Sequence, residues 1–496
     1  MSLTIPQLLS GLRAKGVSLS LSNGAISLKG TVEALMAADR ENLQTRDTDI
    51  ILYLGAHAAT AAPSLKPSGI NPRPAQSQLA WWHWVTESPF PLPIERIAMV
   101  RTFPGSSQNA VAAIEQIVTR HDTLRSSFSE KDGELVIALN PAQDFIVETE
   151  GPVSGEDTAL ARAQEFVRGA LPTKGKWLVK AKVIDWAGPD VVVALLLSHL
   201  VVDGISIDLL RGDLEEILSG AAKAERPPQF TDYAEWEHDW IAGDAGRALI
   251  DYWANWLGDQ VPLRAPQSGR PLEWQHGRNV DYHFELASAP RSKLYGVAAE
   301  LKTTPFFLYL SLYAMALSRW SGQARFALRC IGDLRRSRQL APVVGYMTCA
   351  DPIEVQIKRG DDFAAVLKFI TAEYYNAAML RLPSMLKFPA HPARPGIEKE
   401  KFSEAIAATI NYMPDRRRPG AAADESGPDN SAWPPAVTRD AVQEWPALLW
   451  PIYLRLYDIG GKTKGLLQFN DAIITAQEQE DLLSCFFDVI AEVTAG

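Results

Sequence analysis

The run of residues best suited to chemistry follows a strongly apolar stretch, DVVVALLLSHLVVDG, in the first half of the chain. Its β-branched residues predict a buried strand that ends at Leu197, and Ser198 and His199 come directly after it. Asp203 and Gly204 follow, with the glycine permitting a tight turn before a new amphipathic pattern. A neutral imidazole in a loop at a strand end can accept a proton from a nucleophile. His199 is therefore a candidate general base.

The spacing H-x-x-x-D-G does not decide this alone, because an ordinary loop histidine followed by a helix-capping Asp203 would share it. Other chemistries have less support. The remaining histidines lack an i,i+4 histidine partner or an HExxH frame, so no metal site is predicted. The tripeptide Gly461-Lys462-Thr463 superficially resembles a P-loop, but Leu456 stands where that motif has its first glycine, so no nucleotide site is predicted.

Two series of strand and helix patterns surround this run and must position it. In the first, apolar strands such as ERIAMV and WLVKAKVI alternate with helical stretches such as NAVAAIEQIVTRH. The second has the helical stretches LIDYWANWLGDQ and TPFFLYLSLYAMALSRWSG and the strands ATINYMP, PIYLRLYD and GLLQFND. The sequence therefore predicts an α/β protein with two lobes, residues 74–247 and 248–496. Two polar stretches in the second lobe, 391–401 and 414–440, are predicted to be long loops.

Residues 1–60 form a separate pattern. Helical spacing at 3–15 is followed by GVSLSLSNGAISLKG, in which apolar residues alternate around Asn23-Gly24 and predict a β-hairpin. A second helical pattern, from about 32 to 54, would cover one face of the hairpin, and a Pro/Ser/Gly-rich run at 61–73 predicts a linker. A unit this small without catalytic residues is expected to bind a partner's extended segment at the hairpin edge, and a stabilising extension is the alternative.

Composition excludes several classes of function. The net charge is -10 and the positive residues are scattered, which gives no reason to expect nucleic acid or a membrane surface as a partner. No stretch approaches the roughly 20 apolar residues needed to span a bilayer, and the first residues lack the apolar core of a signal peptide. The 3 cysteines form no CxxC pair, so neither a disulfide framework nor a zinc knuckle is predicted and a cytoplasmic location is expected.

Several runs, in this order, resemble the motif series of nonribosomal peptide synthetase condensation domains. They are PAQSQLAWW (74–82), RHDTLRSSF (120–128), LSHLVVDGIS (197–206), FTDYAEW (230–236) and a degenerate VVGYMTCADPIEV (343–355). Within the family, the chain resembles the stand-alone releasing enzymes of hybrid polyketide pathways such as that making enacyloxin. Residues 1–60 separately resemble the β-hairpin docking domains found at the front of some synthetase and polyketide proteins.

The resemblance implies a two-lobed, chloramphenicol-acetyltransferase-like fold with a central tunnel, and it implies a role for each residue of the core run. His199 matches the family's functional histidine and would lie halfway along the tunnel. Asp203 matches an aspartate that points away from the substrate and pairs with an arginine, for which Arg335 is the best candidate. Gly204 would border the reacting thioester. Ser198 replaces the family's first histidine, a supporting position, so activity is expected to survive.

The resemblance also implies the reaction: transfer of an acyl chain from a carrier-protein phosphopantetheine thioester onto a hydroxyl or amine acceptor, with no cofactor bound by the enzyme itself. Because the chain ends soon after its last helical pattern, we expect the donor to arrive in trans, with residues 1–60 binding the C-terminal docking tail of an upstream carrier protein. A small hydroxy or amino acid is the expected acceptor. An acyl-CoA-dependent acyltransferase of the same fold and a catalytically inactive scaffolding module are the alternatives.

Overall fold

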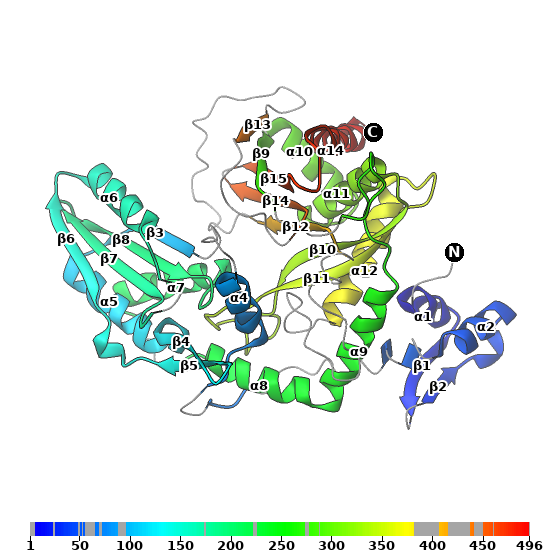
Figure 1. Cartoon of the computed structure of the whole chain (residues 1–496), viewed down its shortest axis with the longest axis horizontal. Helices are drawn as coiled ribbons and strands as arrows, with labels where there is room; N and C mark the ends of the chain where they lie inside the picture. The colour runs from blue at the N-terminus through cyan, green and yellow to red at the C-terminus, as the bar shows by residue number, and fades with distance from the viewer. Residues whose placement is uncertain are drawn as a thin grey trace. The chain divides into compact units, whose positions relative to one another are not determined.

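The structure of the protein, a computed structural model, divides into two compact units. It describes residues 5–22, 25–47, 50–51, 53–54, 65–68, 72–87, 96–172, 175–221, 226–272, 277–286, 288–380, 406–414, 437–440, 450–459 and 461–495. Unit 1 contains residues 1–60, 244–332 and 350–496, and unit 2 contains residues 61–243 and 333–349 (Figure 1). Residues 333–349 therefore group with unit 2, whereas the sequence-based division places them in the second lobe. The division into docking domain, linker and two lobes stays a prediction.

Unit 2 is built on a four-stranded sheet with the order β3-β8-β7-β6. The strands are β3 (Arg96–Pro104), β6 (Val147–Val153), β7 (Val179–Trp186) and β8 (Asp190–Ser198). β8 is antiparallel to both neighbours, and β6 and β7 are parallel. Every residue of β8 after Asp190 is buried, so the sheet is covered on both faces. This explains why the strand has a continuous apolar run instead of an alternating one.

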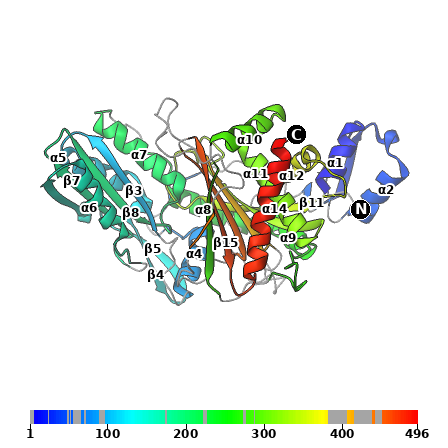
Figure 2. The ribbon, with the colours of Figure 1, turned by 90° about the horizontal axis from the view of Figure 1, so that it is seen from above.

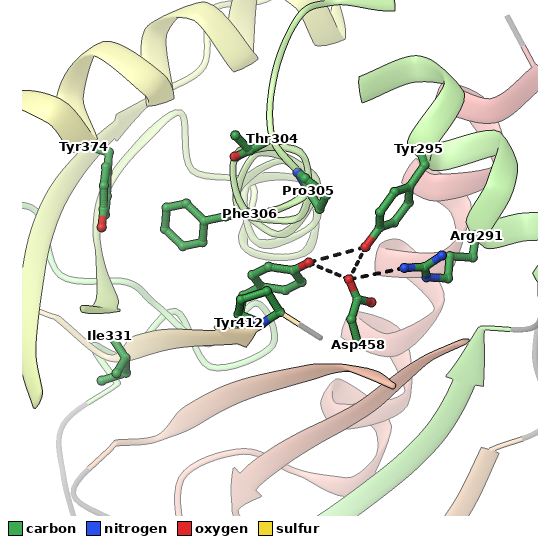
Figure 3. Close-up of a pocket in the computed structure, with 10 residues that line it drawn as sticks. Arg291, Tyr295, Thr304, Pro305, Phe306, Ile331, Tyr374, Tyr412 and Asp458 are labelled. Atoms are coloured by element: carbon green, nitrogen blue, oxygen red, sulfur yellow. Dashed lines mark hydrogen bonds and ion pairs between the residues drawn. The ribbon is translucent and has the colours of Figure 1, made fainter. Parts of the chain in front are cut away.

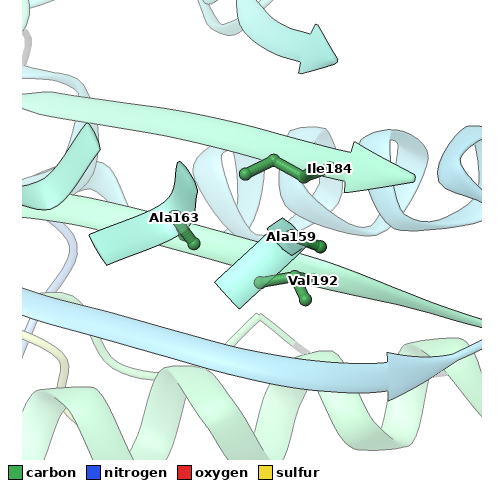
Figure 4. Close-up of a cluster of buried hydrophobic side chains, with 5 residues drawn as sticks. Ala159, Ala163, Ile184 and Val192 are labelled. Carbon is green, nitrogen blue, oxygen red and sulfur yellow. The ribbon is translucent and has the colours of Figure 1, made fainter. Parts of the chain in front are cut away.

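Helix α6 (Glu156–Arg168) packs on this sheet through small side chains. Ala159 and Ala163 are fully buried against Ile184 of β7 and Val192 of β8 (Figure 4). Alanines bring a helix close to a sheet because they add little volume at the contact. The β-branched residues of the strands then fill the space beside the helix.

The remaining elements of unit 2 surround the sheet and carry the motif segments. They are α4 (Gln76–Glu87), α5 (Ser107–Arg120), η3 (Asp122–Arg125), β4 (Ser126–Lys131), β5 (Glu134–Leu139), η4 (Ala142–Asp144), α7 (Gly204–Leu218) and α8 (Phe230–Ala242). β4 and β5 pair as a two-stranded sheet. α5 packs beside α7 and against β7.

The described residues of unit 1 form a seven-stranded sheet with the order β11-β10-β12-β14-β15-β9-β13. Its strands are β9 (Asn279–Leu286), β10 (Arg325–Asp333), β11 (Thr348–Gln356), β12 (Ala408–Met413), β13 (Val437–Asp440), β14 (Ile452–Ile459) and β15 (Lys462–Asn470). β13 lies within the stretch 414–440, so the prediction of a loop is wrong for its last four residues, which pair with β9. Residues 391–401 and 415–436 lie outside the described residues.

After its N-terminal segment, unit 1 also contains several helices among its described residues. They are α9 (Asp244–Gly258), α10 (Ser288–Glu300), α11 (Pro305–Ser321), α12 (Phe363–Met379) and α14 (Ala476–Ala495). α10, α11 and α14 lie beside one another (Figure 2). Phe284 of β9 contacts Phe486 and Phe487 of α14, with ring centroids 6.1 and 5.2 Å away. No helix among the described residues has both the length and the apolarity to cross a membrane.

The N-terminal segment contains α1 (Ile5–Ala14), then β1 (Val17–Ser22) and β2 (Ala25–Gly30), which pair as a hairpin. Ser22 lies opposite Ala25, so two residues connect the strands, as the alternation predicts; these two, Asn23 and Gly24, lie outside the described residues.

The single helix predicted from about 32 to 54 is divided. η1 (Val32–Ala34) is followed by a separate α2 (Ala37–Thr45), and helical backbone returns near residue 50. The division occurs because the Asp39 carboxylate accepts a hydrogen bond from the Met36 N–H, 2.8 Å away, and so begins a new helix there.

The packing predicts a cost for adding one methyl group to β15. A Cβ at Gly465 would lie 2.0 Å from the Phe284 ring, whereas a Cβ at Gly296 of α10 would meet nothing within 4 Å. We expect Gly465→Ala to cost about 1–3 kcal/mol and to lower the melting temperature, because a packed ring must move. Gly296→Ala is the matched control and should be neutral or slightly stabilising, since alanine favours a helix. Equal melting temperatures for the two variants would contradict the packing.

Candidate active site

His199 lies in the short connection between β8 and α7. β8 ends at Ser198, one residue later than predicted, and α7 begins at Gly204. The Ser198 hydroxyl oxygen accepts a hydrogen bond from the Leu200 N–H at 3.2 Å and so fixes the turn in which His199 stands. Ser198 is buried, while His199 is half-buried. The predicted loop position at the end of a buried strand is therefore present in the structure.

Two aromatic side chains contact the imidazole. The Trp81 ring of α4 has its centroid 5.0 Å from that of His199, and the Tyr346 ring has its centroid 4.8 Å away. The two aromatic rings also contact each other, at 5.7 Å. Contacts from two rings restrict the rotation of the imidazole. No sequence pattern assigns either residue to His199, because both are far from it along the chain.

Side chains from two other motif segments hold the backbone after His199. Gln78 of the opening motif donates a hydrogen bond to the Leu200 carbonyl at 3.1 Å. Thr123 of the second motif donates one to the Val201 carbonyl at 2.8 Å. All four residues are buried, and the two bonds satisfy carbonyl groups that the turn leaves outside the sheet.

The first turn of α4 is fixed by a buried carboxyl group. Glu237 of α8, which is fully buried, accepts hydrogen bonds from the Gln76 N–H at 2.6 Å and from the Tyr233 hydroxyl at 3.0 Å. Burial raises the pKa of Glu237 to about 7, although both hydrogen bonds favour its charged form. One residue further, the Ser77 hydroxyl donates to the Tyr346 carbonyl at 3.0 Å. Hydrogen bonds of α4 therefore run from Glu237, the partner of Tyr233 in the fourth motif, to the backbone of Tyr346, whose ring contacts His199.

Asp203 and Arg335 form a buried ion pair. The guanidinium donates to both carboxylate oxygens, at 2.9 and 3.0 Å, and the side chains of Arg335 and Asp203 are only 2% and 1% exposed. Asp203 also caps α7 by accepting the Ser206 N–H at 2.8 Å, and it accepts the Met347 N–H at 2.8 Å. The pairing that the resemblance implies is thus present, and Asp203 is directed at Arg335.

The charged state of the pair is favoured in spite of its burial. Burial alone would raise the pKa of Asp203, but the charge and hydrogen bonds of Arg335, together with those from Ser206, lower it below its ordinary value. The pKa of Arg335 is likewise raised by Asp203 and Asp333 against the effect of burial. The pair is therefore charged at neutral pH.

Gly345 completes this network through its backbone. Its carbonyl accepts hydrogen bonds from Arg335 at 3.0 Å and from the Ser206 hydroxyl at 2.9 Å. A Cβ at this position would lie 2.3 Å from the Phe230 ring of α8, so no other residue fits without moving the ring. The fifth motif therefore has a glycine at position 345 because its backbone lies close to the Phe230 ring of the fourth motif.

The structure does not support a tight turn at Gly204. This glycine has no positive φ and begins α7 with ordinary backbone, so the expectation is wrong. Gly204 is exposed, and a Cβ there would meet nothing within 4 Å. Asp203 instead makes the turn by capping the helix. The expected border with a thioester stays a prediction, as does the tunnel.

Comparisons with known proteins bear on this arrangement. The family model of the condensation domain matches residues 106–379. A solved structure from work on condensation domain-mediated chain release from the enacyloxin polyketide synthase superposes with a TM-score of 0.89 at 38% identity, covering 99% of this chain and 97% of that one. The chain belongs to the condensation-domain family. Its two-lobed α/β fold is the chloramphenicol-acetyltransferase-like fold of that family, whose members transfer acyl or peptidyl groups.

Curated relatives are much longer proteins. Gramicidin S synthase 2 of Brevibacillus brevis is 26% identical over 213 residues, 43% of this chain. Bacitracin synthase 2 of Bacillus licheniformis is 24% identical over 334 residues, 65% of this chain. The matched regions span 5% and 12% of those two proteins, so the likeness concerns a small part of each.

The buried pair predicts a large loss of stability on removal of one charge. Arg335→Ala leaves the Asp203 carboxylate buried without its cation, which costs about 3–5 kcal/mol. Because the folded pKa of Asp203 is lowered, the pair contributes fully near neutral pH and its contribution disappears as the pH falls below about 4. The difference in melting temperature between wild type and variant should therefore be greatest near pH 7 and shrink in acid. Arg338→Ala, at an exposed position, is the control and should melt like wild type.

Proposed function

We propose that this condensation domain transfers an acyl chain from the phosphopantetheine thioester of a carrier protein onto a hydroxyl or amine acceptor and so releases the chain. The observation that carries the proposal is the half-buried imidazole of His199, which contacts the rings of Trp81 and Tyr346. The likeness to a protein associated with chain release from a polyketide synthase supports the releasing reaction. Phosphopantetheine would arrive on the carrier as part of the substrate.

The proposed step needs one base and no covalent enzyme intermediate. The acceptor's O–H or N–H gives its proton to His199 as its oxygen or nitrogen bonds to the thioester carbonyl carbon. A tetrahedral oxyanion forms and then collapses, the C–S bond breaks, and the proton passes to the leaving thiolate. A thioester is already activated, so alignment and proton handling are the enzyme's main tasks. Packing of His199 by Trp81 and Tyr346 supports alignment.

The preferred acceptor is a small hydroxy or amino acid. The family resemblance implies an asparagine near Cys349 and a late His-Gln-Asp-x-Pro-Phe-Glu motif, and this sequence has neither, which suits an unusual acceptor. The family likeness does not separate ester from amide formation. Two alternatives stay open to test: a donor in the form of acyl-CoA, and an inactive scaffolding role. Offering acyl-CoA beside the loaded carrier decides the first, and turnover of either donor excludes the second.

We also propose that residues 1–60 bind an extended segment from the upstream carrier protein. β1 and β2 form a two-stranded sheet of their own among the described residues, and such an edge accepts a further strand. The segment is held together by the buried Leu8 and Leu12 of α1 and by the ion pair between Lys15 and Asp39, at 2.7 Å. A preformed hairpin would gain affinity from main-chain hydrogen bonds.

His199→Ala should lower turnover by about 10²–10⁴-fold, the usual contribution of a general base. Ester formation should suffer more than amide formation, because a neutral hydroxyl is a poorer nucleophile than a neutral amine. Intact-protein mass spectrometry of a loaded carrier, with a panel of alcohol and amine acceptors, measures both. His283→Ala, on β9 of unit 1, is the control. Near-wild-type turnover by His199→Ala on both kinds of acceptor would remove the base role.

Deleting residues 1–60 should slow transfer at low carrier concentration and have little effect at saturating carrier, because a tether acts by raising effective concentration. Tyr53 packs on Tyr252 of α9, with centroids 5.8 Å apart, so the melting temperature of the truncated protein must be checked. A carrier without its C-terminal tail, offered to the full chain, is the independent control and should show the same loss. Undiminished transfer in both experiments would exclude docking by this segment.

A further inference from the structure

Unit 1 contains a pocket whose lining includes neither His199 nor the two aromatic residues that contact it. It has a volume of about 520 Å³, which is in the range of small-molecule sites (Figure 3). Its walls come from α10, α12, β10, β12, β14 and the beginning of α11, all within one unit. The lining residues are Arg291, Tyr295, Thr304, Pro305, Phe306, Ile331, Tyr374, Tyr412, Pro414 and Asp458.

A buried carboxylate organises the polar wall. Asp458 has a side chain only 4% exposed and accepts hydrogen bonds from the Tyr412 hydroxyl at 2.5 Å, from the Thr463 hydroxyl at 2.5 Å and from the Tyr295 hydroxyl. The Arg291 guanidinium lies 3.6 Å from the same carboxylate. Figure 3 shows the two tyrosines and the arginine converging on Asp458. Three hydroxyl donors and one guanidinium in ion-pair range therefore surround one carboxylate.

These contacts fix what the tyrosine oxygens can offer a ligand. Burial, together with the hydrogen bond to Asp458, raises the pKa of Tyr295 to about 12, and the same causes raise the pKa of Tyr412, so both stay protonated. Each hydroxyl has a single proton, which is accepted either by Asp458 or by the oxygen of the other tyrosine, 3.3 Å away. The oxygens of Tyr295 and Tyr412 are left as acceptors only. A ligand that bonds to them must bring its own O–H or N–H.

The charges of the polar wall cancel. Arg291 is the cation nearest Asp458 among the described lining residues, and its guanidinium also lies over the Tyr295 ring, 4.0 Å from the centroid. A carboxylate ligand would be repelled by Asp458, and an ammonium group would be repelled by Arg291. A neutral polar group avoids both costs. A hydroxyl satisfies the wall fully, since it donates to a tyrosine oxygen and can accept from the guanidinium.

The opposite wall is apolar. Phe306, at the beginning of α11, contacts Tyr374 of α12 with ring centroids 4.9 Å apart. Pro305, Ile331 and Pro414 complete this side. Such a surface favours saturated or unsaturated carbon chain over polar groups. The pocket therefore combines an apolar wall with a polar wall that has no net charge and needs a hydrogen-bond donor on the ligand.

We propose that this pocket binds a neutral acyl chain that carries a hydroxyl group, with the hydroxyl donating to Tyr412 or Tyr295 and the carbon chain lying on Phe306. The inference rests on the proposed acyl transfer, because that function identifies the occupant as an acyl chain. It names a class of donor: a reduced, hydroxylated chain of the kind that reductive processing of a polyketide produces.

The test compares three N-acetylcysteamine thioesters, ω-hydroxydecanoyl, ω-methoxydecanoyl and decanoyl, by calorimetric titration of the full chain without acceptor. The hydroxyl probe should bind about 3- to 10-fold tighter than decanoyl, as one hydrogen bond provides. The methoxy probe should show no gain, because it cannot donate. Equal binding of all three would overturn the proposal, and so would tighter binding of an ω-carboxydecanoyl probe.

Variants locate the effect. Tyr412→Phe should abolish the hydroxyl preference, with Tyr295→Phe as the second variant if the first fails to fold. Tyr375→Phe, next to Tyr374 but 55% exposed and outside the lining, should keep it. A preference retained in both lining variants would place binding elsewhere and overturn the proposal. Because these titrations involve no turnover, they are independent of the His199 experiment: failed transfer with the preference intact would count against the proposed function and leave the pocket standing.

Discussion

The buried pair of Asp203 and Arg335 is the interaction on which the arrangement around His199 depends. The Asp203 carboxylate accepts hydrogen bonds from the Arg335 guanidinium, caps α7 and accepts the N–H of Met347. The residue before Met347 is Tyr346, whose ring contacts the imidazole. The ion pair thus fixes the backbone next to a side chain that contacts the imidazole of His199. Burial makes this constraint strong, since the charges have no alternative partner in water.

The structure explains the motif segments physically, because residues in or beside several of them hold the backbone and helices around His199. Gln78 and Thr123 hold the backbone after His199, and Gly345 allows a ring of α8 to approach. Glu237, directly after the fourth run, holds the beginning of α4. Segments separated by more than a hundred residues are therefore constrained together. This explains why the order and content of the runs carry a family signal while the spacing of the core run alone does not.

The hydropathy pattern of the sequence predicted most helices and strands. Its predictions were wrong where a side chain caps a helix, because a capping hydrogen bond leaves no trace in the hydropathy pattern. The apolar run of β8 identified a strand because both faces are buried, and the alternation around Asn23 identified a hairpin. The helix expected at 32–54 is interrupted at Met36 by a cap that hydropathy does not register, and the turn expected at Gly204 is made by Asp203.

The two sites differ in how far the sequence reveals them. Resemblance named Arg335 as the partner of Asp203, but no periodicity relates the two. The pocket around Asp458 was invisible in the sequence, because its lining comes a few residues at a time from six separate elements. Only the folded chain brings such residues together, and none of them belongs to a motif that could be recognised beforehand.

The discontinuity of unit 2 has a consequence for recombination. Unit 2 consists of residues 61–243 and a second, short segment, 333–349, which contains Arg335, Gly345 and Tyr346. A gene segment encoding 61–243 alone would carry His199, Asp203 and Trp81 but neither Arg335 nor Tyr346. Exchange of lobes between related enzymes at a single crossover would join the aspartate of one parent to the arginine-bearing segment of the other. A viable chimera therefore needs segments 61–243 and 333–349 that fit each other, so that Asp203 and Arg335 can still pair.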